Sequence, residues 1–388
     1  MAVVKKLLAA LAATTLLTGG ASQTYEFSEE ELISGEALKA LSKEAYENAL
    51  ARLPESGEGC TRENVRVRKE WRNLPAEMRI KYVAAVQCLM ESESEYVDVD
   101  GAKTAFDDFA VLHYNLTPFV HNSATFLTFH RYYIHTFEEQ LRNKCGYDGD
   151  FPYWEWGLDC DDPAKSPLFD GSETSLGSDG EPVEAGAGGG GGFGGGFGFG
   201  MGGGSGGGCV MKGPFSNYTV NLGPSSRANP LEYNPRCIKR DLNGGICRQN
   251  ASLRNTTTVI TDSPDIELFQ AIMQGDMRYP EARGLGMAVH GGGHFTIGGD
   301  PGGDFYFSPL EPAFFQHHGQ IDRMYFVWQN LDFENRQNIA GTGTMMNQPP
   351  SDEVEITELL DLSPLAQPRP IKDLIDTIGQ SPFCFVYE

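Results

Sequence analysis

Several motifs of common metal sites are missing from this sequence of 388 residues. It has no CxxC pair, which argues against a zinc finger, and no HExxH motif, which argues against the common zinc proteases. Beyond residue 22 no run of about eighteen apolar residues occurs, so a transmembrane helix is not expected. No internal repeat appears at the periods of solenoid proteins. These absences favour a soluble, non-repetitive mature chain.

Basic residues are scarce relative to acidic ones. The chain has 30 Lys and Arg against 53 Asp and Glu, which gives a formal net charge of −23. Such a surface repels nucleic acid and anionic membranes. We therefore expect no nucleic acid and no membrane as partners, although the charge indicates nothing specific about the substrate. We also expect a monomer or weak dimer.

The first 22 residues, MAVVKKLLAALAATTLLTGGAS, have the layout of a secretory signal peptide. Two lysines precede a short apolar stretch, and small residues follow it. We expect cleavage near residue 22, and a secreted, extracellular protein. The even count of eight cysteines then predicts disulfides, whose pairing the sequence does not choose. Three sequons are candidates for N-glycosylation, at Asn217, Asn250 and Asn255.

The remaining residues, 23–388, are predicted to form one domain. Helical spacing of apolar residues predicts helices over 28–53, 74–90, 106–113, 123–143 and 312–330. One segment, 186–208, consists largely of glycine, which cannot pack a core. We predict that it is a flexible surface loop inserted into the domain, and not a linker between two domains.

All eight histidines lie in two short stretches, and four of them fall between residues 113 and 140. His113, His121 and His130 are eight and nine residues apart. On one continuous helix, His113 and His121 would be separated by about 12 Å along the axis, too far to share one ion. We expect Pro118 to break the helix so that the chain returns His121 to His113. His135 is predicted to be structural.

The second stretch contains HGGGH, from His290 to His294, and then FFQHHGQID. A spacing of four places His290 and His294 on one face of a helix, although three glycines form helix poorly. His318 lies four residues before Asp322, which could hold a ligand imidazole or form an ion pair. Imidazole sets without thiolate or carboxylate suit copper, zinc or iron. Two such sets indicate a pair of ions.

The residues in these stretches resemble a known family. HNSATFLTFHRYYIHTFE, residues 121–138, and EPAFFQHHGQID, residues 311–322, are similar to the two copper motifs of tyrosinases and catechol oxidases. FPYWEW at 151–156 and FCFVYE at 383–388 also resemble stretches of that family. The resemblance covers residues 71–388. It implies a mainly α fold in which an antiparallel four-helix bundle holds a dicopper centre, with extensive loops and few short strands.

The resemblance also implies roles for single residues. Copper A would be bound by His113, His121 and His130, and copper B by His290, His294 and His318, while His317 would line the pocket. Asp322 would support the site from behind or serve only in an ion pair. The two ions would use O2 to oxidise phenols, as in a short secreted fungal-type polyphenol oxidase without a C-terminal shielding domain.

Departures from the family pattern bear on the substrate. Phe119 stands where many fungal relatives have a cysteine that bonds to a histidine, so no thioether is expected. Phe305 takes the place of the family's gate residue. Gly291 replaces the Asn or Asp of many tyrosinases, and Glu281 is the candidate for the glutamate that holds a catalytic water. We therefore expect an oxidase of o-diphenols or o-aminophenols with weak or no monophenol hydroxylation. The alternatives are a true tyrosinase and, less favoured, a haemocyanin-like O2 carrier.

Overall fold

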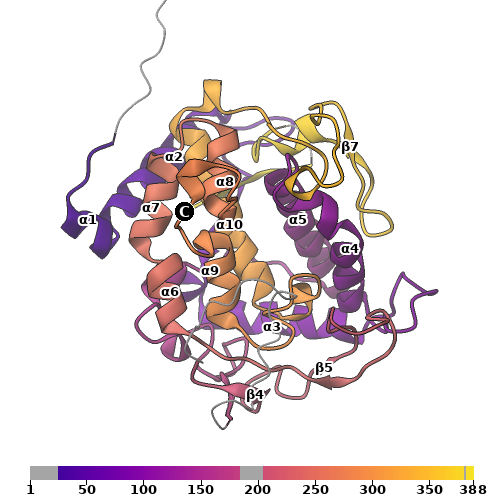
Figure 1. The fold of residues 1–388 in the computed structure, drawn as a ribbon. Helices are drawn as coiled ribbons and strands as arrows, with labels where there is room; N and C mark the ends of the chain where they lie inside the picture. Colours follow the sequence, from indigo (N-terminus) through magenta and orange to yellow (C-terminus); the bar gives the residue numbers. More distant parts are fainter. Residues whose placement is uncertain (1–24, 184–203, 380–381) are drawn as a thin grey trace, which may run out of the picture.

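A computed structural model describes residues 25–183, 204–379 and 382–388 of the chain. The predicted signal peptide lies outside the described residues, as does most of the predicted glycine-rich loop. Helices form the body of the described part, which confirms the mainly α prediction (Figure 1). Their bounds are α1 Glu29–Ser34, α2 Glu36–Arg52, α3 Ala76–Glu91, α4 Ala105–Val120, α5 Phe126–Cys145, α6 Gly244–Asn250, α7 Leu253–Thr261, α8 Ile266–Gln274, α9 Ala288–Ile297 and α10 Phe314–Leu331.

The strands are short, with two to five residues each. The largest sheet in the described part has three parallel strands in the order β2-β1-β9, which joins the chain's last residues to its first half. Three two-stranded antiparallel pairs complete the described strands. Their bounds are β1 Arg66–Glu70, β2 Pro152–Tyr153, β3 Gly180–Pro182, β4 Gly207–Val210, β5 Thr219–Val220, β6 Arg236–Cys237, β7 Leu359–Leu360, β8 Arg369–Pro370 and β9 Phe385–Tyr387.

Local sequence explains where the main helices begin and end. Thr104 and Asp107 form a capping box at the start of α4, each side chain accepting a hydrogen bond from the other residue's backbone. α5 ends at Gly146, which adopts a left-handed conformation that glycine tolerates well. Gly35, also left-handed, divides the predicted helix over 28–53 into α1 and α2.

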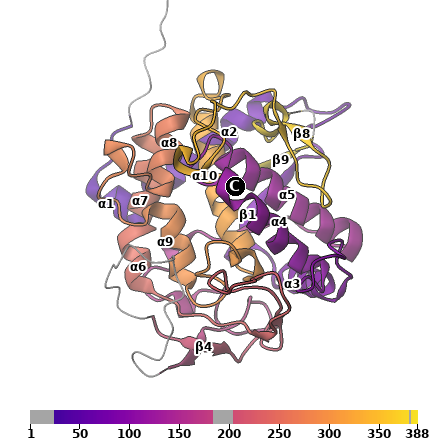
Figure 2. The same cartoon turned by 45° about the vertical axis from the view of Figure 1, so that its right-hand side comes forward.

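Four helices make up the helical core and carry seven of the eight histidines, with His121 directly after α4, in agreement with the predicted four-helix bundle. α4 and α5 lie side by side on one side of the molecule, next to α9 and α10, in both Figure 1 and Figure 2. α10 packs against α5 and α9, and α5 packs against α3 and α4. Every residue of α10 is buried, including its polar ones. Such a helix requires a partner for each polar side chain.

Buried ion pairs supply several of those partners and join α5 to α10. Asp322 of α10 accepts hydrogen bonds from Arg131 Nε of α5 (2.5 Å) and Arg68 Nη1 of β1 (3.2 Å). Tyr387 of β9 donates its hydroxyl to the same carboxylate at 2.7 Å. Arg68 also pairs with Glu138 of α5 at 2.7 Å. One carboxylate therefore ties together two helices and two strands of the sheet.

All eight cysteines are paired, which confirms the predicted disulfides. The bridge with the greatest separation along the chain, 324 residues, joins the segment after α2 to the residue directly before β9. The described residues form the pairs Cys60–Cys384, Cys88–Cys145, Cys160–Cys247 and Cys209–Cys237. Within these residues no helix has both the length and the apolar character that a membrane span requires.

The end of the predicted glycine-rich loop is ordered structure, which corrects the predicted bounds of 186–208. Gly207 and Gly208 belong to β4, which pairs with β3. A Cβ added to Gly180 would lie 2.2 Å from the Gly208 carbonyl oxygen, and one added to Gly204 would lie 2.4 Å from the Asp241 oxygen. Glycine is required here because neighbouring backbone approaches closely.

Candidate metal centre

The first histidine set lies at the junction of α4 and α5. His113 is in α4, His121 is the residue at which α4 ends, and His130 is in α5. Each is buried, and one ring nitrogen of each lies within 4.8 Å of one from the others. Pro118 does not break α4, contrary to the prediction, but lies in its last turn. The chain leaves the helix at His121 instead, and the His113 and His121 ring centroids lie 5.2 Å apart.

Backbone carbonyls fix the tautomer of this set. The Nδ1 of His130 donates to the Phe126 carbonyl at 2.8 Å, and that of His121 donates to the Thr117 carbonyl at 3.1 Å. His113 Nδ1 donates across to the carbonyl of Tyr306, at 2.9 Å. A proton on Nδ1 leaves the lone pair on Nε2, the atom that a metal would take. The Nε2 atoms of His113 and His130 are buried without a partner.

The second set comes from α9 and α10. HGGGH is helical throughout, so His290 and His294 lie on one face as predicted. His318 Nε2 of α10 lies 3.3 Å from His294 Nε2. The glycines let neighbouring side chains approach α9 closely: a Cβ on Gly293 would lie 2.3 Å from His317 Nδ1, and one on Gly292 would lie 2.7 Å from the Asn250 Cβ. The cost of glycine in a helix is offset by this packing.

His317 also lies within 4.8 Å of this set, so distance alone does not separate it from His318. The indole Nε1–H of Trp156 donates to His317 Nδ1 at 3.1 Å. An indole only donates, so His317 Nδ1 is an acceptor and the proton of the neutral ring is on Nε2. In this tautomer neither nitrogen of His317 offers a free lone pair, because Nδ1 accepts from Trp156 and Nε2 carries the proton, for which the described residues provide no acceptor. The ring of His318 is not held in this way, which favours it as the ligand.

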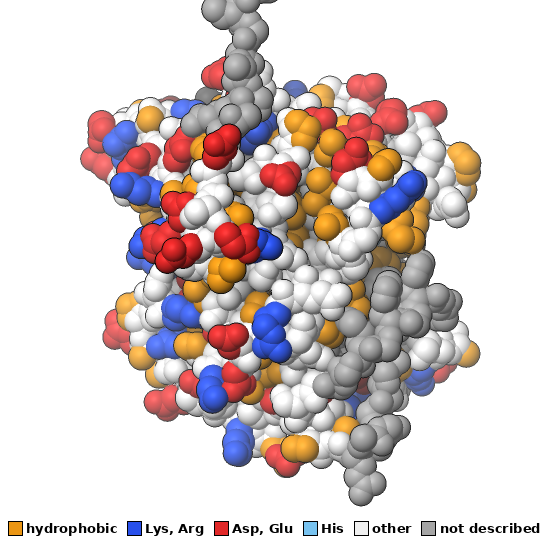
Figure 3. Space-filling model, turned by 60° about the vertical axis from the view of Figure 1, so that its left-hand side comes forward, with side chains coloured by type: hydrophobic (Ala, Val, Ile, Leu, Met, Phe, Trp, Pro, Cys, Tyr) orange, Lys and Arg blue, Asp and Glu red, His pale blue; other side chains and the backbone are white. Residues whose placement is uncertain are grey.

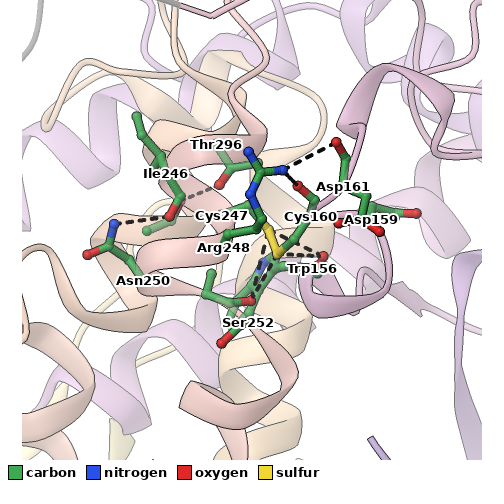
Figure 4. The surroundings of a disulfide bond; sticks show 12 residues. Trp156, Asp159, Cys160, Asp161, Ile246, Cys247, Arg248, Asn250, Ser252 and Thr296 are labelled. Atoms are coloured by element: carbon green, nitrogen blue, oxygen red, sulfur yellow. Dashed lines mark hydrogen bonds between the residues drawn. A yellow bond between two sulfur atoms is a disulfide. The ribbon is translucent and has the colours of Figure 1, made fainter. Parts of the chain in front are cut away.

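A disulfide holds Trp156 in place. Cys160, four residues after Trp156, is bonded to Cys247 of α6. Figure 4 shows the Arg248 guanidinium beside this bridge, and it donates to the Cys160 carbonyl at 2.8 Å. Because α6 packs against α9, the bridge fixes the Trp156 segment relative to the second histidine set.

The two sets face one another across the bundle. The His130 and His318 rings are stacked with their centroids 4.2 Å apart, and the centroids of His121 and His290 are 5.9 Å apart. Folding therefore brings together all six predicted ligands, although His113 and His318 are 205 positions apart in the sequence. Neither metal-capable group among the described residues contains a carboxylate or thiolate.

Burial keeps these imidazoles neutral. Desolvation lowers the pKa of His113 to about 4 and that of His294 to about 3, and it moves the pKa values of the other four well below the usual range. Neighbouring imidazoles lower most of them further, since two cations close together repel. Neutral imidazoles with unshared Nε2 lone pairs are the donors that copper accepts. The two sets therefore fit a pair of copper ions.

Of the two roles predicted for Asp322, the structure shows the ion pair and not a hydrogen bond to a histidine. Its oxygens accept hydrogen bonds from Arg131, Arg68 and Tyr387. Arg323, the other partner considered, pairs with Glu155 at 2.9 Å. Since Arg131 directly follows His130, the Asp322–Arg131 bond joins the α5 and α10 backbones beside their ligands.

Two of the predicted pocket residues have defined neighbours, and their role in the pocket stays a prediction. The half-buried ring of Phe305 lies over His121, with centroids 4.7 Å apart. Gly291 follows His290 in α9, and a Cβ there would meet the Met287 Cβ at 3.0 Å. Phe119 is 49% exposed, and no free cysteine exists to form a thioether.

Glu281 is exposed and lies in a short turn of 3-10 helix, Pro280–Ala282. Its role in holding a water stays a prediction.

One predicted glycosylation site is wrong. Asn250 is buried: its amide nitrogen donates to the Ile246 carbonyl at 3.0 Å, and its oxygen accepts from the Met287 backbone at 3.2 Å. A glycan there would remove the packing between α6 and α9. Asn217 is exposed, and Asn255 donates its amide to the Gln249 carbonyl at 2.9 Å. Both stay predictions.

Sequence reasoning missed the residues that position the ligands. Trp156 was noted within FPYWEW, but no spacing rule connects it to His317, 161 residues later. Arg68 and Tyr387 carry no metal-binding signal in the sequence, because neither residue type is a usual ligand of the metals considered.

Comparison with known proteins agrees with this geometry. The common central domain of tyrosinase matches residues 103–331. "Tyrosinase P" of Aspergillus terreus is 37% identical over 335 residues, 83% of this chain and 91% of the relative. "N-acetyl-6-hydroxytryptophan oxidase ivoB" of Emericella nidulans is 34% identical, over 85% of this chain and 94% of the relative.

A solved structure gives the same result. The chain superposes on a glycine-to-asparagine variant of polyphenol oxidase from Thermothelomyces thermophila with a TM-score of 0.77. The two are 34% identical, and the match covers 92% of this chain and 97% of the other. Matched domain, relatives and paired histidine sets together identify the chain as a fungal-type member of the tyrosinase family, a copper oxidoreductase with a type 3 dicopper centre.

Proposed function

We propose that the protein oxidises o-diphenols or o-aminophenols to quinones and hydroxylates monophenols weakly or not at all. The observation that carries this proposal is Gly291, the residue after the first histidine of α9. Hydroxylation of a monophenol requires that the phenol first lose its proton. Glycine has no side chain with which to hold a water or accept that proton.

Bound copper would supply the electron transfer, since two ions can take two electrons from the substrate and pass them to O2. The overall reaction converts two diphenols and one O2 into two quinones and two waters. The chain contributes a fixed set of neutral imidazoles and an apolar wall. The ring of Phe305 over His121 offers a face on which a phenol ring can stack.

A second candidate is a true tyrosinase. One observation favours it: a relative 37% identical carries the name tyrosinase. This candidate requires a base other than a side chain at Gly291. Glu281 is the predicted source, and it is exposed to solvent.

The test is to replace Gly291 with Asn and to measure hydroxylation of tyrosine and oxidation of catechol separately. We expect the ratio of tyrosine to catechol turnover to rise by about tenfold, less than the roughly 10²–10⁴-fold contribution of a positioned general base, because asparagine can only orient a water. Gly291→Ala is the matched control, since it adds the same Cβ beside Met287 without a polar group. A wild-type protein that hydroxylates tyrosine without lag, at the catechol rate, would refute the diphenol proposal.

We also propose that the protein acts outside the cell. The leader-like residues 1–22 support this, as do four disulfides, which persist in oxidising compartments. Expression of the whole gene, followed by activity measurements in the medium and in the cell extract, tests it. Activity confined to the extract would contradict the proposal.

A further inference from the structure

A polar pocket lies on the outer side of the turn that carries His121. Its volume is about 200 Å³, and its walls come from that turn, from α8 and the segment after it, and from the loop beyond α10. The lining residues used below are Asn122, Gln270, Thr342, Glu267, Asp276, Arg278 and Glu353. None of the predicted site residues lines it, so it is separate from the metal centre.

The pocket carries an excess of negative charge. Three carboxylates line it, from Glu267, Asp276 and Glu353, against the single guanidinium of Arg278. Arg278 is already paired with Asp276, at 2.6 Å. The Tyr279 hydroxyl donates to Glu267 at 2.7 Å, and the Gly341 backbone donates to Glu353 at 3.0 Å. These three hydrogen-bond donors of the pocket are therefore already bound to carboxylates, and the carboxylate oxygens still have lone pairs that can accept further hydrogen bonds.

Three buried polar atoms of the lining residues have no hydrogen-bond partner: Asn122 Oδ1, Gln270 Oε1 and Thr342 Oγ1. The Gln270 amide has a fixed orientation, because its nitrogen donates to the Ala340 carbonyl at 2.7 Å. Two of these three atoms can only accept a hydrogen bond. A buried acceptor without a partner costs free energy, so a guest that donates to it would be stabilised.

The pocket is also coupled to the metal centre through Asn122, the residue after His121. Asn122 donates its backbone N–H to Gln274 at 2.7 Å, and its carbonyl accepts from Arg278 Nη2 at 3.1 Å and from the Met346 backbone at 3.0 Å. Its φ of 43° is left-handed, a conformation that asparagine tolerates. The lining residues therefore set the backbone that positions His121.

From charge, acceptors and volume we infer that this pocket binds a small organic ammonium group, such as an alkyl diamine. A metal ion fits less well, because the lining carboxylates do not form one of the metal-capable groups among the described residues. The space also exceeds that of a bare ion. An ammonium group donates up to three hydrogen bonds, and its positive charge offsets the excess negative charge of the pocket.

Binding of 1,4-diaminobutane to the copper-loaded protein, without phenol, tests the inference by isothermal titration calorimetry. 1,4-Butanediol is the uncharged probe of the same length. We expect saturable binding of one diamine per chain and no binding of the diol. Glu267→Gln and Glu353→Gln each keep one acceptor oxygen and remove the charge, and each should weaken diamine binding by about tenfold. Both side chains are exposed, so folding is retained.

Glu47→Gln is the matched control, since Glu47 is an exposed acid on α2 outside the pocket. It should leave the affinity unchanged. Equal weakening by all three variants would mean that the diamine is only a counter-ion of an acidic protein, and would overturn the inference. Equal affinity for the diol and the diamine would overturn the assignment of a cation, as would the absence of saturable binding.

Discussion

His317 and His318 are neighbours on one helix, but hydrogen bonding gives them different chemistry. Trp156 occupies Nδ1 of His317, and the remaining nitrogen carries the proton. His318 Nε2 instead approaches His294 Nε2. The hydrogen bond from Trp156 therefore favours a tautomer of His317 that does not bind metal, and the position of His318 beside His294 favours His318 as the ligand.

Copper content distinguishes the two residues. We expect His318→Ala to lose half of the bound copper, because one imidazole set would then have only two ligands. His317→Ala should keep the full amount. Metal analysis of both purified variants by mass spectrometry provides the measurement. If His317→Ala lost as much copper as His318→Ala, the argument from the Trp156 bond would be wrong.

The lowered pKa of His135 should make the free energy of unfolding depend on pH. It is buried against Phe383, and desolvation lowers its pKa to about 3, against about 6.5 in an unfolded chain. As pH falls below 6.5, the unfolded chain gains a proton that the folded protein does not. The free energy of unfolding therefore falls with pH, and this histidine accounts for about 2 kcal/mol between pH 7 and pH 5.

Urea unfolding of wild type and His135→Asn at both pH values measures this contribution. The variant should lose about 2 kcal/mol less stability on acidification. Both proteins must be compared in the same copper state, so that release of metal cancels. An identical loss in the two proteins would contradict the assignment.

At the scale of elements, α5 and α10 are held in register by a buried carboxylate. Removal of Asp322 would leave Arg131 and Arg68 buried beside each other without their shared anion. An uncompensated buried charge costs about 3–5 kcal/mol. Asp322→Ala should therefore reduce the free energy of unfolding by that amount, as measured by urea denaturation.

The control for this variant is Glu47→Ala, which removes an exposed ion pair with Lys43 at 3.8 Å. It should change stability by no more than about 0.5 kcal/mol. A comparably small effect of Asp322→Ala would mean that water or another group replaces the carboxylate.

The sequence predicted the helices with strong apolar periodicity and missed the shorter ones. α3, α5 and α10 were predicted because each has four or more turns of patterned sequence. α6 to α9 have seven to ten residues each, too few for a pattern, and HGGGH argued against helix. The side chains of His317 and Asn250 against Gly293 and Gly292 explain why the helix forms, and such tertiary contacts are not visible in a local window.

The candidate ligands were predicted because metal binding requires specific residue types, which a sequence displays directly. Their support was not, because it depends on contacts between distant segments. Asp322 was read as a neighbour of His318 or Arg323, whereas its partners come from α5, β1 and β9. Asn250 matched a sequon, although its burial in the folded chain excludes a glycan. Disulfide pairing was likewise decided only by the fold.

At the scale of the whole molecule, disulfides close loops of very different length. Cys60–Cys384 spans 324 residues, and Cys209–Cys237 spans 28. A longer closed loop removes more entropy from the unfolded chain. Replacing both cysteines of the first pair by serine should therefore lower stability by about 2 kcal/mol more than the same change in the second pair.

Thermal unfolding of the two double variants, in the same copper state, provides the comparison. Cys60–Cys384 also anchors β9, whose Tyr387 hydrogen-bonds to Asp322. Both the longer closed loop and this anchoring predict that removal of Cys60–Cys384 lowers the melting temperature more than removal of Cys209–Cys237. An equal shift in melting temperature for the two variants would show that the unfolded chain retains structure near one of the bridges.

The pairing of β3 with β4 has a practical consequence for engineering. Pro182 lies opposite Gly207, so the chain enters and leaves the segment 184–203 at neighbouring points. A deletion can therefore join the two strands through a short turn without displacing any histidine. Doubling the length of a flexible loop between fixed ends raises the free-energy cost of closing it by only about 0.6 kcal/mol. Insertion of a foreign peptide or a small fluorescent domain at this point should therefore leave the fold intact.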